Sequence, residues 1–272
     1  FTTMVKDKWR LLFRYRWRHA IVDAGVEYWF HRMKVRDYPE RWLKWYVNKA
    51  KQLSRIFNDR VWIVIPDYPD DYTPCMTYED DMDNVDKTLR NIEEFISIDG
   101  VAWLPVIQSR FENTFSFIES CHRLRKLIGS YPRVAIGTVC KARKLAWIEY
   151  CLKYARSVFS NSWIHAFGLT LSALERVKTA NSSFDSTAWD TRRRLWLDSF
   201  DSMAWSYDKL REYDRRKRSW RTRAVIDSFD SMAYTFPRYR GRPSAKSVDA
   251  RLRYFNAYLQ RIGEILGDEL EL

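Results

Sequence analysis

The sequence predicts a (β/α)8 TIM-type barrel that folds as a single domain over residues 1–272. Short apolar runs alternate with longer amphipathic stretches at intervals of about 30–40 residues, as repeated βαβ units require. The apolar runs are continuous, which is typical of strands buried on both faces of a parallel sheet. The chain has only 8 glycines and no glycine-rich phosphate loop, so an open doubly wound sheet is disfavoured.

Five apolar runs, rich in Val, Ile and aromatic residues, have the length of strands. These predicted strands are residues 19–25, 61–67, 101–108, 133–139 and 163–169. Between and after them, apolar residues recur at helical spacing, often behind good capping residues. The predicted helices are residues 39–57, 83–96, 113–128, 142–154, 170–178 and 248–266.

The last third of the chain repeats one phrase three times, at residues 183–189 (SFDSTAW), 199–205 (SFDSMAW) and 228–234 (SFDSMAY). The first two copies start 16 residues apart. That spacing is too short for a strand, a crossover helix and a second parallel strand. We therefore expect residues 190–225 to be a basic segment, inserted in the barrel or duplicated.

Charge and composition favour a polyanionic partner. The net charge is +12 and the pI is about 9.5, and lysine and arginine release counterions from phosphates. Aromatic residues make up 16% of the chain, with 13 Trp, and some of them could stack on bases. Both DNA and tRNA fit this pattern.

The sequence also predicts a reducing, cytoplasmic setting. The four cysteines form no CxxC pair, so neither a metal site nor a disulfide framework is expected. No apolar run approaches the ~20 residues that a membrane span needs. The first residues are basic and aromatic, unlike a signal peptide, and the missing initiator Met is typical of a processed or truncated N-terminus.

A consistent set of residues stands at the ends of the predicted strands, where a parallel barrel places its reactive groups. They are Asp23, Asp67, Gln108, Gly137, His165 and Asp185. Each has a structural alternative, since a strand-end Asp commonly caps a helix and a lone His is more often a satisfied core residue. Carboxylates that share one mouth nevertheless predict a functional site.

In order along the chain, the segments IVDAG, IVIPD, PVIQ, VAIGTV, IHAFG and SFDS resemble the strand-end motifs of the tRNA-guanine transglycosylase superfamily. The similarity spans residues 19–190 and rests on the order and spacing of the motifs. It implies exchange of guanine for a 7-deazaguanine base in DNA or tRNA through a covalent aspartyl intermediate. No cofactor is expected.

The resemblance also implies residue roles. Asp185 would be the nucleophile and Asp23 the general acid and base, because two displacements at C1′ of the sugar need both. The base-binding residues would be Asp67, Gln108, Gly137 and His165, with Asp67 and Gln108 reading the guanine edge and Gly137 giving a backbone contact. Because the SFDS phrase is repeated, Asp230 and Asp201 are alternative nucleophiles.

The chain departs from the family pattern in three places. Asp23–Val26 reads DAGV where the family has Asp-Ser-Gly-Gly, and Ser109 replaces the glycine after Gln108. The Cys-x-Cys-x-x-Cys…His zinc element is missing, so a barrel without a zinc subdomain is predicted, and the DNA-modifying relatives become a live alternative. The family often forms dimers, so a homodimer or a partner subunit is possible.

Two other functions stay open at this point. The chain could be a non-catalytic nucleic-acid-binding homologue, or the partner subunit of such an enzyme. It could also be an unrelated barrel enzyme, such as a retaining glycosidase that uses two of the carboxylates. The net charge of +12 fits a sugar substrate less well.

Overall fold

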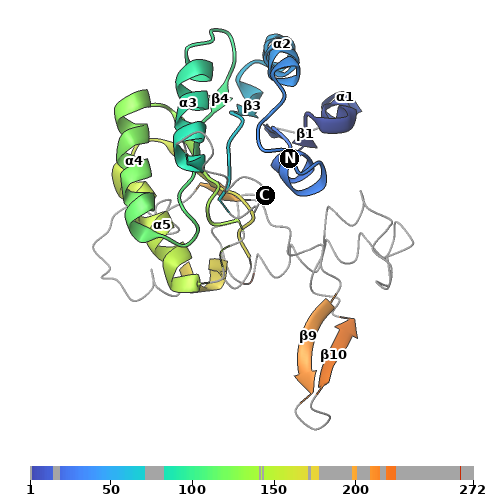
Figure 1. Cartoon of the computed structure of the whole chain (residues 1–272), viewed down its shortest axis with the longest axis vertical. Coiled ribbons are helices and arrows are strands. Elements are labelled where there is room, and N and C mark those ends of the chain that lie inside the picture. The colour runs from blue at the N-terminus through green and yellow to red at the C-terminus, as the bar shows by residue number, and fades with distance from the viewer. Residues whose placement is uncertain are drawn as a thin grey trace. The chain divides into compact units, whose positions relative to one another are not determined.

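The computed structural model divides the chain into two compact units (Figure 1). The first contains Phe1–Phe167 with Trp196–Ser199, and the second contains Gly168–Leu195 with Phe200–Leu272. The structure describes residues 2–14, 19–70, 83–140, 142, 144–170, 173–177, 198–200, 209–214, 219–224 and 264. All the elements that build the candidate site belong to the first unit.

The parallel strands follow one another in chain order. The first sheet has the order β1-β2-β3-β4, and its strands are β1 (Thr2–Thr3), β2 (Ala20–Asp23), β3 (Val61–Val64) and β4 (Trp103–Leu104). The second has the order β5-β6-β7-β8, and its strands are β5 (Val106–Ile107), β6 (Arg133–Ile136), β7 (Trp163–Ala166) and β8 (Ser199–Phe200). Every strand pair from β1 to β4 and from β5 to β7 is parallel.

Pro105 separates β4 from β5 and so divides the two sheets. Proline has no N–H and cannot donate to a ladder. Its carbonyl still accepts a hydrogen bond from the Ala135 N–H at 2.8 Å. The apolar cluster of Val64, Leu104, Val106 and Ala135 spans both sheets, so the core continues across the break.

Helices connect the parallel strands. They are α2 (Glu40–Phe57), α3 (Asn84–Ile96), α4 (Thr114–Ile128) and α5 (Leu145–Val158). Crossovers between parallel strands are right-handed, and a sequential strand order therefore places successive helices on the same face of the sheet. Figure 1 shows α3, α4 and α5 side by side outside the strands, and α4 contacts both of the others.

Helix α2 shows why these segments pack as they do. Its residues Tyr46, Ala50 and Leu53 recur at helical spacing and are all buried. The Tyr46 hydroxyl donates to the Val64 carbonyl at 2.5 Å, so the phenol both fills the core and binds the end of β3. A 3₁₀ turn, Val5–Arg10, and the short helix α1 (Leu11–Arg14) lie between the parallel strands β1 and β2, and a π-helical segment, Glu27–Arg32, lies between β2 and α2.

The second unit contains an antiparallel hairpin of β9 (Lys209–Asp214) and β10 (Ser219–Ala224). Its register pairs Asp214 with Ser219 and Lys209 with Ala224. The hairpin lies within the basic segment that the sequence singles out. The single-domain organisation, with residues 190–225 inserted, stays a prediction.

The prediction of an eight-stranded barrel is wrong. In the described part of the chain, two four-stranded sheets are present, and no pairing joins β1 to β8. After β7, the described residues include a helical segment at 173–177 and the two-residue strand β8 beside β7, and the basic segment then pairs locally with itself as a hairpin. The four residues between β9 and β10 are too few for a crossover between parallel strands. The five predicted strand regions and the four helices between them are nevertheless confirmed.

The predicted ends differ from the observed ones for local reasons. Strand β3 ends at Val64, since Pro66 cannot donate to a ladder. Of the predicted helix 170–178, the structure describes residues 170 and 173–177. The predicted helix 248–266 lies outside the described residues except for Glu264. No helix in the described ranges is long and apolar enough to cross a membrane.

Candidate functional site

The carboxyl ends of β3 and β5 bring together a buried acid and a buried amide. Asp67 follows β3 and is 6% exposed, and Gln108 follows β5 and is 4% exposed. The Gln108 Nε2 donates to Asp67 Oδ2 at 2.5 Å. Two of the residues to which the family resemblance gives a role in base binding therefore contact each other, although 41 positions separate them.

The orientation of the Gln108 amide follows from its partner. A carboxylate accepts and cannot donate, so the amide nitrogen must face Asp67 and the oxygen must face away. Gln108 Oε1 is buried and has no hydrogen-bond partner among the described residues. A buried acceptor left in this way costs about 1–3 kcal/mol, and a ligand N–H would remove that cost.

Gly137 makes room for the amide. A Cβ at this position would lie 2.3 Å from Gln108 Nε2 and 2.8 Å from Val106 Cγ1, so only glycine fits. Its N–H donates to the Ile107 carbonyl, and its own carbonyl accepts from the Cys140 N–H. The predicted backbone contact to a base would therefore use the second lone pair of the Gly137 carbonyl.

A pair of buried hydroxyls, on the residues that follow Gln108 and Gly137, is not among the predicted site residues. Ser109 Oγ and Thr138 Oγ1 are 2.8 Å apart, and both residues are buried. They directly follow Gln108 and Gly137, at the ends of adjacent strands. Their position one residue past each predicted strand-end residue is the signal that could have found them.

His165 lies closer to the core than Gln108. It is 3% exposed and pairs in register with Ala135, which pairs with Val106. In-register neighbours in a parallel sheet share a face, and so do residues two apart along a strand. His165 therefore lies on the same face as Gln108, one layer closer to the core, where its ring packs edge-on against Phe167 at 4.7 Å.

Asp23 ends β2 in a fixed turn. Its Oδ2 accepts a hydrogen bond from the Gly25 N–H at 2.8 Å. Gly25 has φ +88°, and a Cβ there would lie 2.0 Å from Val5 Cγ2. The sequence Asp-Ala-Gly is thus explained by local geometry, since the glycine holds the turn that orients the carboxylate.

Two buried phenols, Tyr38 and Tyr46, feel the charges of both Asp23 and Asp67. Burial raises the pKa of Tyr38 and of Tyr46 well above the usual value, and the charges of Asp67 and Asp23 raise both further. Both carboxylates therefore act on the same pair of rings. The Tyr38 hydroxyl also donates to the Asp67 carbonyl at 3.0 Å, which fixes the backbone that carries this acid.

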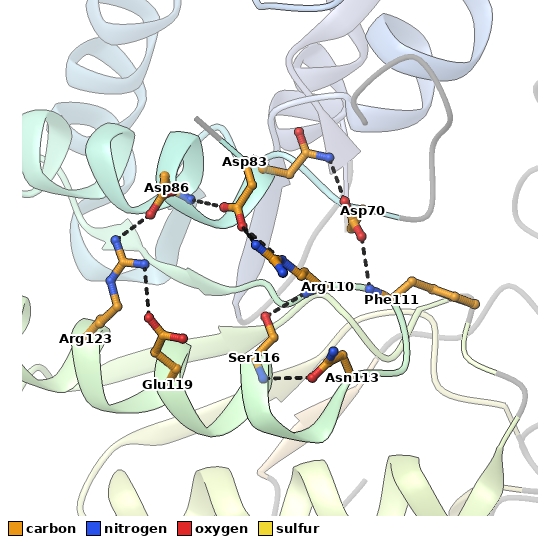
Figure 2. Close-up of polar contacts among 10 residues, drawn as sticks. Asp70, Asp83, Asp86, Arg110, Phe111, Asn113, Ser116, Glu119 and Arg123 are labelled. Atoms are coloured by element: carbon orange, nitrogen blue, oxygen red, sulfur yellow. Dashed lines mark hydrogen bonds and ion pairs between the residues drawn. The ribbon is translucent and has the colours of Figure 1, made fainter. Parts of the chain in front are cut away.

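A second polar network ties the loops at this edge together (Figure 2). Asp70 accepts hydrogen bonds from Asn84 Nδ2 and from the Phe111 N–H, each at 3.1 Å. Asp83 caps α3 by accepting from the Asp86 N–H and forms an ion pair with Arg110 at 3.0 Å. The loops after β3 and β5 are therefore joined by charged hydrogen bonds.

The electrostatics of this network differ between its two acids. Burial raises the pKa of Asp70, despite hydrogen bonds from Phe111 and Asn84. Burial also acts to raise the pKa of Asp83, but hydrogen bonds from Asp86 and Arg110 outweigh it, and the pKa is lowered overall. Asp83 therefore keeps its charge to lower pH than an ordinary Asp, and it anchors the network through its contacts with Asp86 and Arg110.

The predicted nucleophile Asp185 and its alternatives Asp201 and Asp230 lie outside the described residues. Within the described ranges, no three His, Cys, Asp or Glu residues are grouped so that they could hold a metal ion. The chain matches no known family model and no curated protein. The resemblance to the tRNA-guanine transglycosylases therefore stays a hypothesis from the motifs.

Proposed function

We propose that the carboxyl ends of the strands bind a guanine-type base, and that the protein exchanges this base in a nucleic acid. The observation that carries the proposal is the buried Gln108 Oε1, which lacks a partner in the described part of the chain and adjoins the Asp67 carboxylate. With the barrel excluded, the proposal depends on these groups and on the order of the motifs rather than on the fold.

The acceptors at this edge favour guanine over the other bases. The Watson–Crick edge of guanine carries two adjacent donors, the N1–H and the 2-amino group. Asp67 and Gln108 Oε1 offer acceptors, whereas adenine would present its own N1 acceptor to them. A buried site that is built for donors rejects a ligand lacking them, because its polar groups then stay unpaired.

Charge supports a nucleic acid as the carrier of this base. Residues 209–223 contain eight basic and two acidic residues, a net +6 that is half of the whole chain's +12. The structure folds most of this segment into the β9–β10 hairpin. A two-stranded ribbon is narrow enough for the major groove of B-DNA, and lysine and arginine contacts to phosphates give affinity for DNA or tRNA alike.

The proposed reaction has two displacements. The Asp185 carboxylate attacks C1′ of the sugar, the C1′–N9 bond breaks, and the protonated Asp23 gives its proton to the leaving guanine. The ionised Asp23 then takes a proton from the incoming 7-deazaguanine base, whose nitrogen attacks C1′ and releases Asp185. Acid and base roles alternate on one residue, as in retaining glycosidases.

Exchange of radiolabelled guanine into DNA and into tRNA tests the activity. Label in one polymer supports base exchange and names the substrate. Binding of both polymers without label would favour the non-catalytic homologue or a missing partner subunit. The expected setting is the cytoplasm, and a homodimer is compatible with the proposal.

The repeated phrase needs its own control. We expect Asp185→Asn to abolish exchange, while Asp230→Asn and Asp201→Asn retain it. All three variants replace an Asp in the same SFDS context, so they are matched in chemistry. Loss of activity in Asp230→Asn alone would move the nucleophile to the third copy.

A further inference from the structure

Helix α3 binds the backbone on both sides of the buried acid Asp67. Asn91 Nδ2 donates to the carbonyl of Pro66 at 2.8 Å. The N–H of Tyr68 donates to Thr88 Oγ1 at 2.9 Å. Asn91 is 3% exposed and Thr88 is 1% exposed, so water competes little for either hydrogen bond. The residue before the acid and the residue after it are therefore both held by one helix.

The Thr88 hydroxyl binds in both directions. Its hydrogen is donated to the Asn84 carbonyl, one turn earlier in α3, at 2.8 Å. The lone pairs of its oxygen therefore remain for the Tyr68 N–H. Asp83 caps this first turn by accepting from the Asp86 N–H. The acceptor for Tyr68 is thus fixed within a capped helix before any ligand binds.

Tyr38 binds the acid from a different segment of the chain. Its hydroxyl donates to the Asp67 carbonyl at 3.0 Å, and its ring packs edge-on against the Tyr68 ring, with the two centroids 5.3 Å apart. The preceding residue, Asp37, forms an ion pair at 3.2 Å with Lys87 of α3, whose side chain is 2% exposed. The segment that carries Tyr38 is therefore tied to the same helix as the neighbours of Asp67.

The position of the Asp67 carboxylate decides which purine the site can distinguish. Gln108 Nε2 donates to Asp67 Oδ2, so the carboxylate already has a fixed protein partner. Guanine differs from hypoxanthine by the 2-amino group, which is a donor and needs an acceptor at the right distance and angle. A displaced carboxylate would leave the apolar contacts of the purine ring unchanged and would weaken this one hydrogen bond.

We propose that Tyr38, Thr88 and Asn91 are positioning residues, which hold the Asp67 carboxylate where it accepts from the 2-amino group of guanine. The inference rests on the proposed function, because it names the groups that set the specificity of the same site. The three side chains bind three consecutive residues from two segments of the chain, so the acid has little freedom to move. An acceptor that is fixed before binding loses less entropy when the ligand arrives.

Calorimetric titration with guanosine and inosine tests this role. In the wild type, guanosine should bind about tenfold more tightly than inosine. Tyr38→Phe, Thr88→Val and Asn91→Leu each remove one hydrogen bond to residues 66–68 and keep a side chain of similar size. We expect the ratio of the two affinities to fall to about threefold in each variant, because guanosine binding weakens while inosine binding changes less. A merely structural role would lower the stability of the protein and leave the ratio at about tenfold.

Two further variants separate positioning from a general loss of structure. Thr88→Ser keeps the hydroxyl and should keep the wild-type ratio that Thr88→Val loses. Tyr131→Phe makes the same change as Tyr38→Phe at a tyrosine whose hydroxyl donates to the Trp103 carbonyl at 3.1 Å, and it should also keep the ratio. Urea denaturation of every variant checks that it is folded under the conditions of the titration.

An unchanged ratio in Tyr38→Phe, Thr88→Val and Asn91→Leu would overturn the positioning role and leave the guanine site standing. An equal fall in Tyr131→Phe or in Thr88→Ser would also overturn it, because the ratio would then not follow the hydrogen bonds to residues 66–68. Equal affinities of the wild type for guanosine and inosine, or no binding of either, would overturn the guanine site and the positioning role together. That failure appears in the wild type before any variant is compared.

Discussion

The two ends of the same parallel strands treat their buried polar groups differently. At the amino end, Asp198 accepts from the Ile164 N–H at 2.7 Å and pairs with Arg156, which also donates to the Ser162 carbonyl. At the carboxyl end, Asp67 holds one side of the Gln108 amide, and the other side has no partner in the described part of the chain.

This difference separates structural polar groups from those that could serve a ligand. Both ends contain charged groups in largely buried positions, so burial alone does not identify a site. At the amino end, Asp198, Arg156 and the Ser162 carbonyl bind one another, and the buried atoms left without a partner among the described residues, Arg156 Nε and Arg133 Nη1, are donors. At the carboxyl end, the acceptor Gln108 Oε1 remains, and glycine at position 137 keeps space for the amide that carries it. Substitutions at the two ends should therefore have different consequences.

The largest effect on stability is expected at the amino end. Asp198→Ala leaves Arg156, whose side chain is 12% exposed, without its carboxylate and removes the acceptor for the Ile164 N–H. We expect a loss of about 2–3 kcal/mol in the free energy of unfolding. Urea denaturation measures it. Guanosine affinity should not change. A loss of guanosine affinity together with the loss of stability would contradict the distinction between the two ends.

A steric change at the carboxyl end should affect both properties. Gly137→Ala forces the Gln108 amide to move, because the new Cβ would lie 2.3 Å from Nε2. We expect a cost of about 1–3 kcal/mol in unfolding free energy and at least a tenfold loss in guanosine affinity. Calorimetric titration measures the affinity.

Gly100→Ala is the control for this substitution. No atom lies within 4 Å of a Cβ at Gly100, although its φ of +75° makes alanine strained. We therefore expect a cost of about 1 kcal/mol with no change in affinity. Equal affinity losses in the two glycine variants would show that Gly137 has no special relation to Gln108.

Asp83 gives a prediction with a defined pH dependence. Its pKa is lowered from 3.8, so its charge stabilises the fold above pH 3.8, and this contribution is lost as the pH falls through the lower pKa of the folded state. Asp83→Ala removes a helix cap and should cost about 1 kcal/mol at pH 7. The stability difference between variant and wild type should shrink below pH 4. A constant difference down to pH 2 would contradict the assigned role.

The smallest effect is expected for Tyr131→Phe at the amino end. The Tyr131 hydroxyl donates to the Trp103 carbonyl at 3.1 Å and lies far along the strands from Gln108. We expect a loss of about 0.5–1.5 kcal/mol in unfolding free energy and unchanged guanosine affinity. Thermal unfolding and the same titration measure the two quantities.

Periodicity made the elements predictable but not their closure. The continuous apolar runs and the helical stripe of Tyr46, Ala50 and Leu53 report local burial, and the structure confirms those strands and helices. Closure into a barrel depends on what pairs with the last strand. The basic segment pairs with itself as a hairpin, and the repeated SFDS phrase on either side of it gave no sign of this pairing.

The candidate site was predictable in part. Parallel strands bring their carboxyl ends to one edge, so the proximity of Asp67 and Gln108 follows from the strand assignments. The amide orientation does not follow, because it depends on the contact with the carboxylate. Tyr38 was missed for a different reason, since an aromatic residue before a helix reads as ordinary core.

Calorimetric titration of the wild-type protein and of Gln108→Leu with guanosine, inosine and adenosine tests the central claim most directly. Inosine keeps the N1–H and lacks the 2-amino group, so its affinity for the wild type should be about tenfold below that of guanosine. Adenosine should not bind, and Gln108→Leu should lose guanosine binding. Equal affinities for guanosine and adenosine, or unchanged guanosine binding in Gln108→Leu, would contradict a guanine site at this edge.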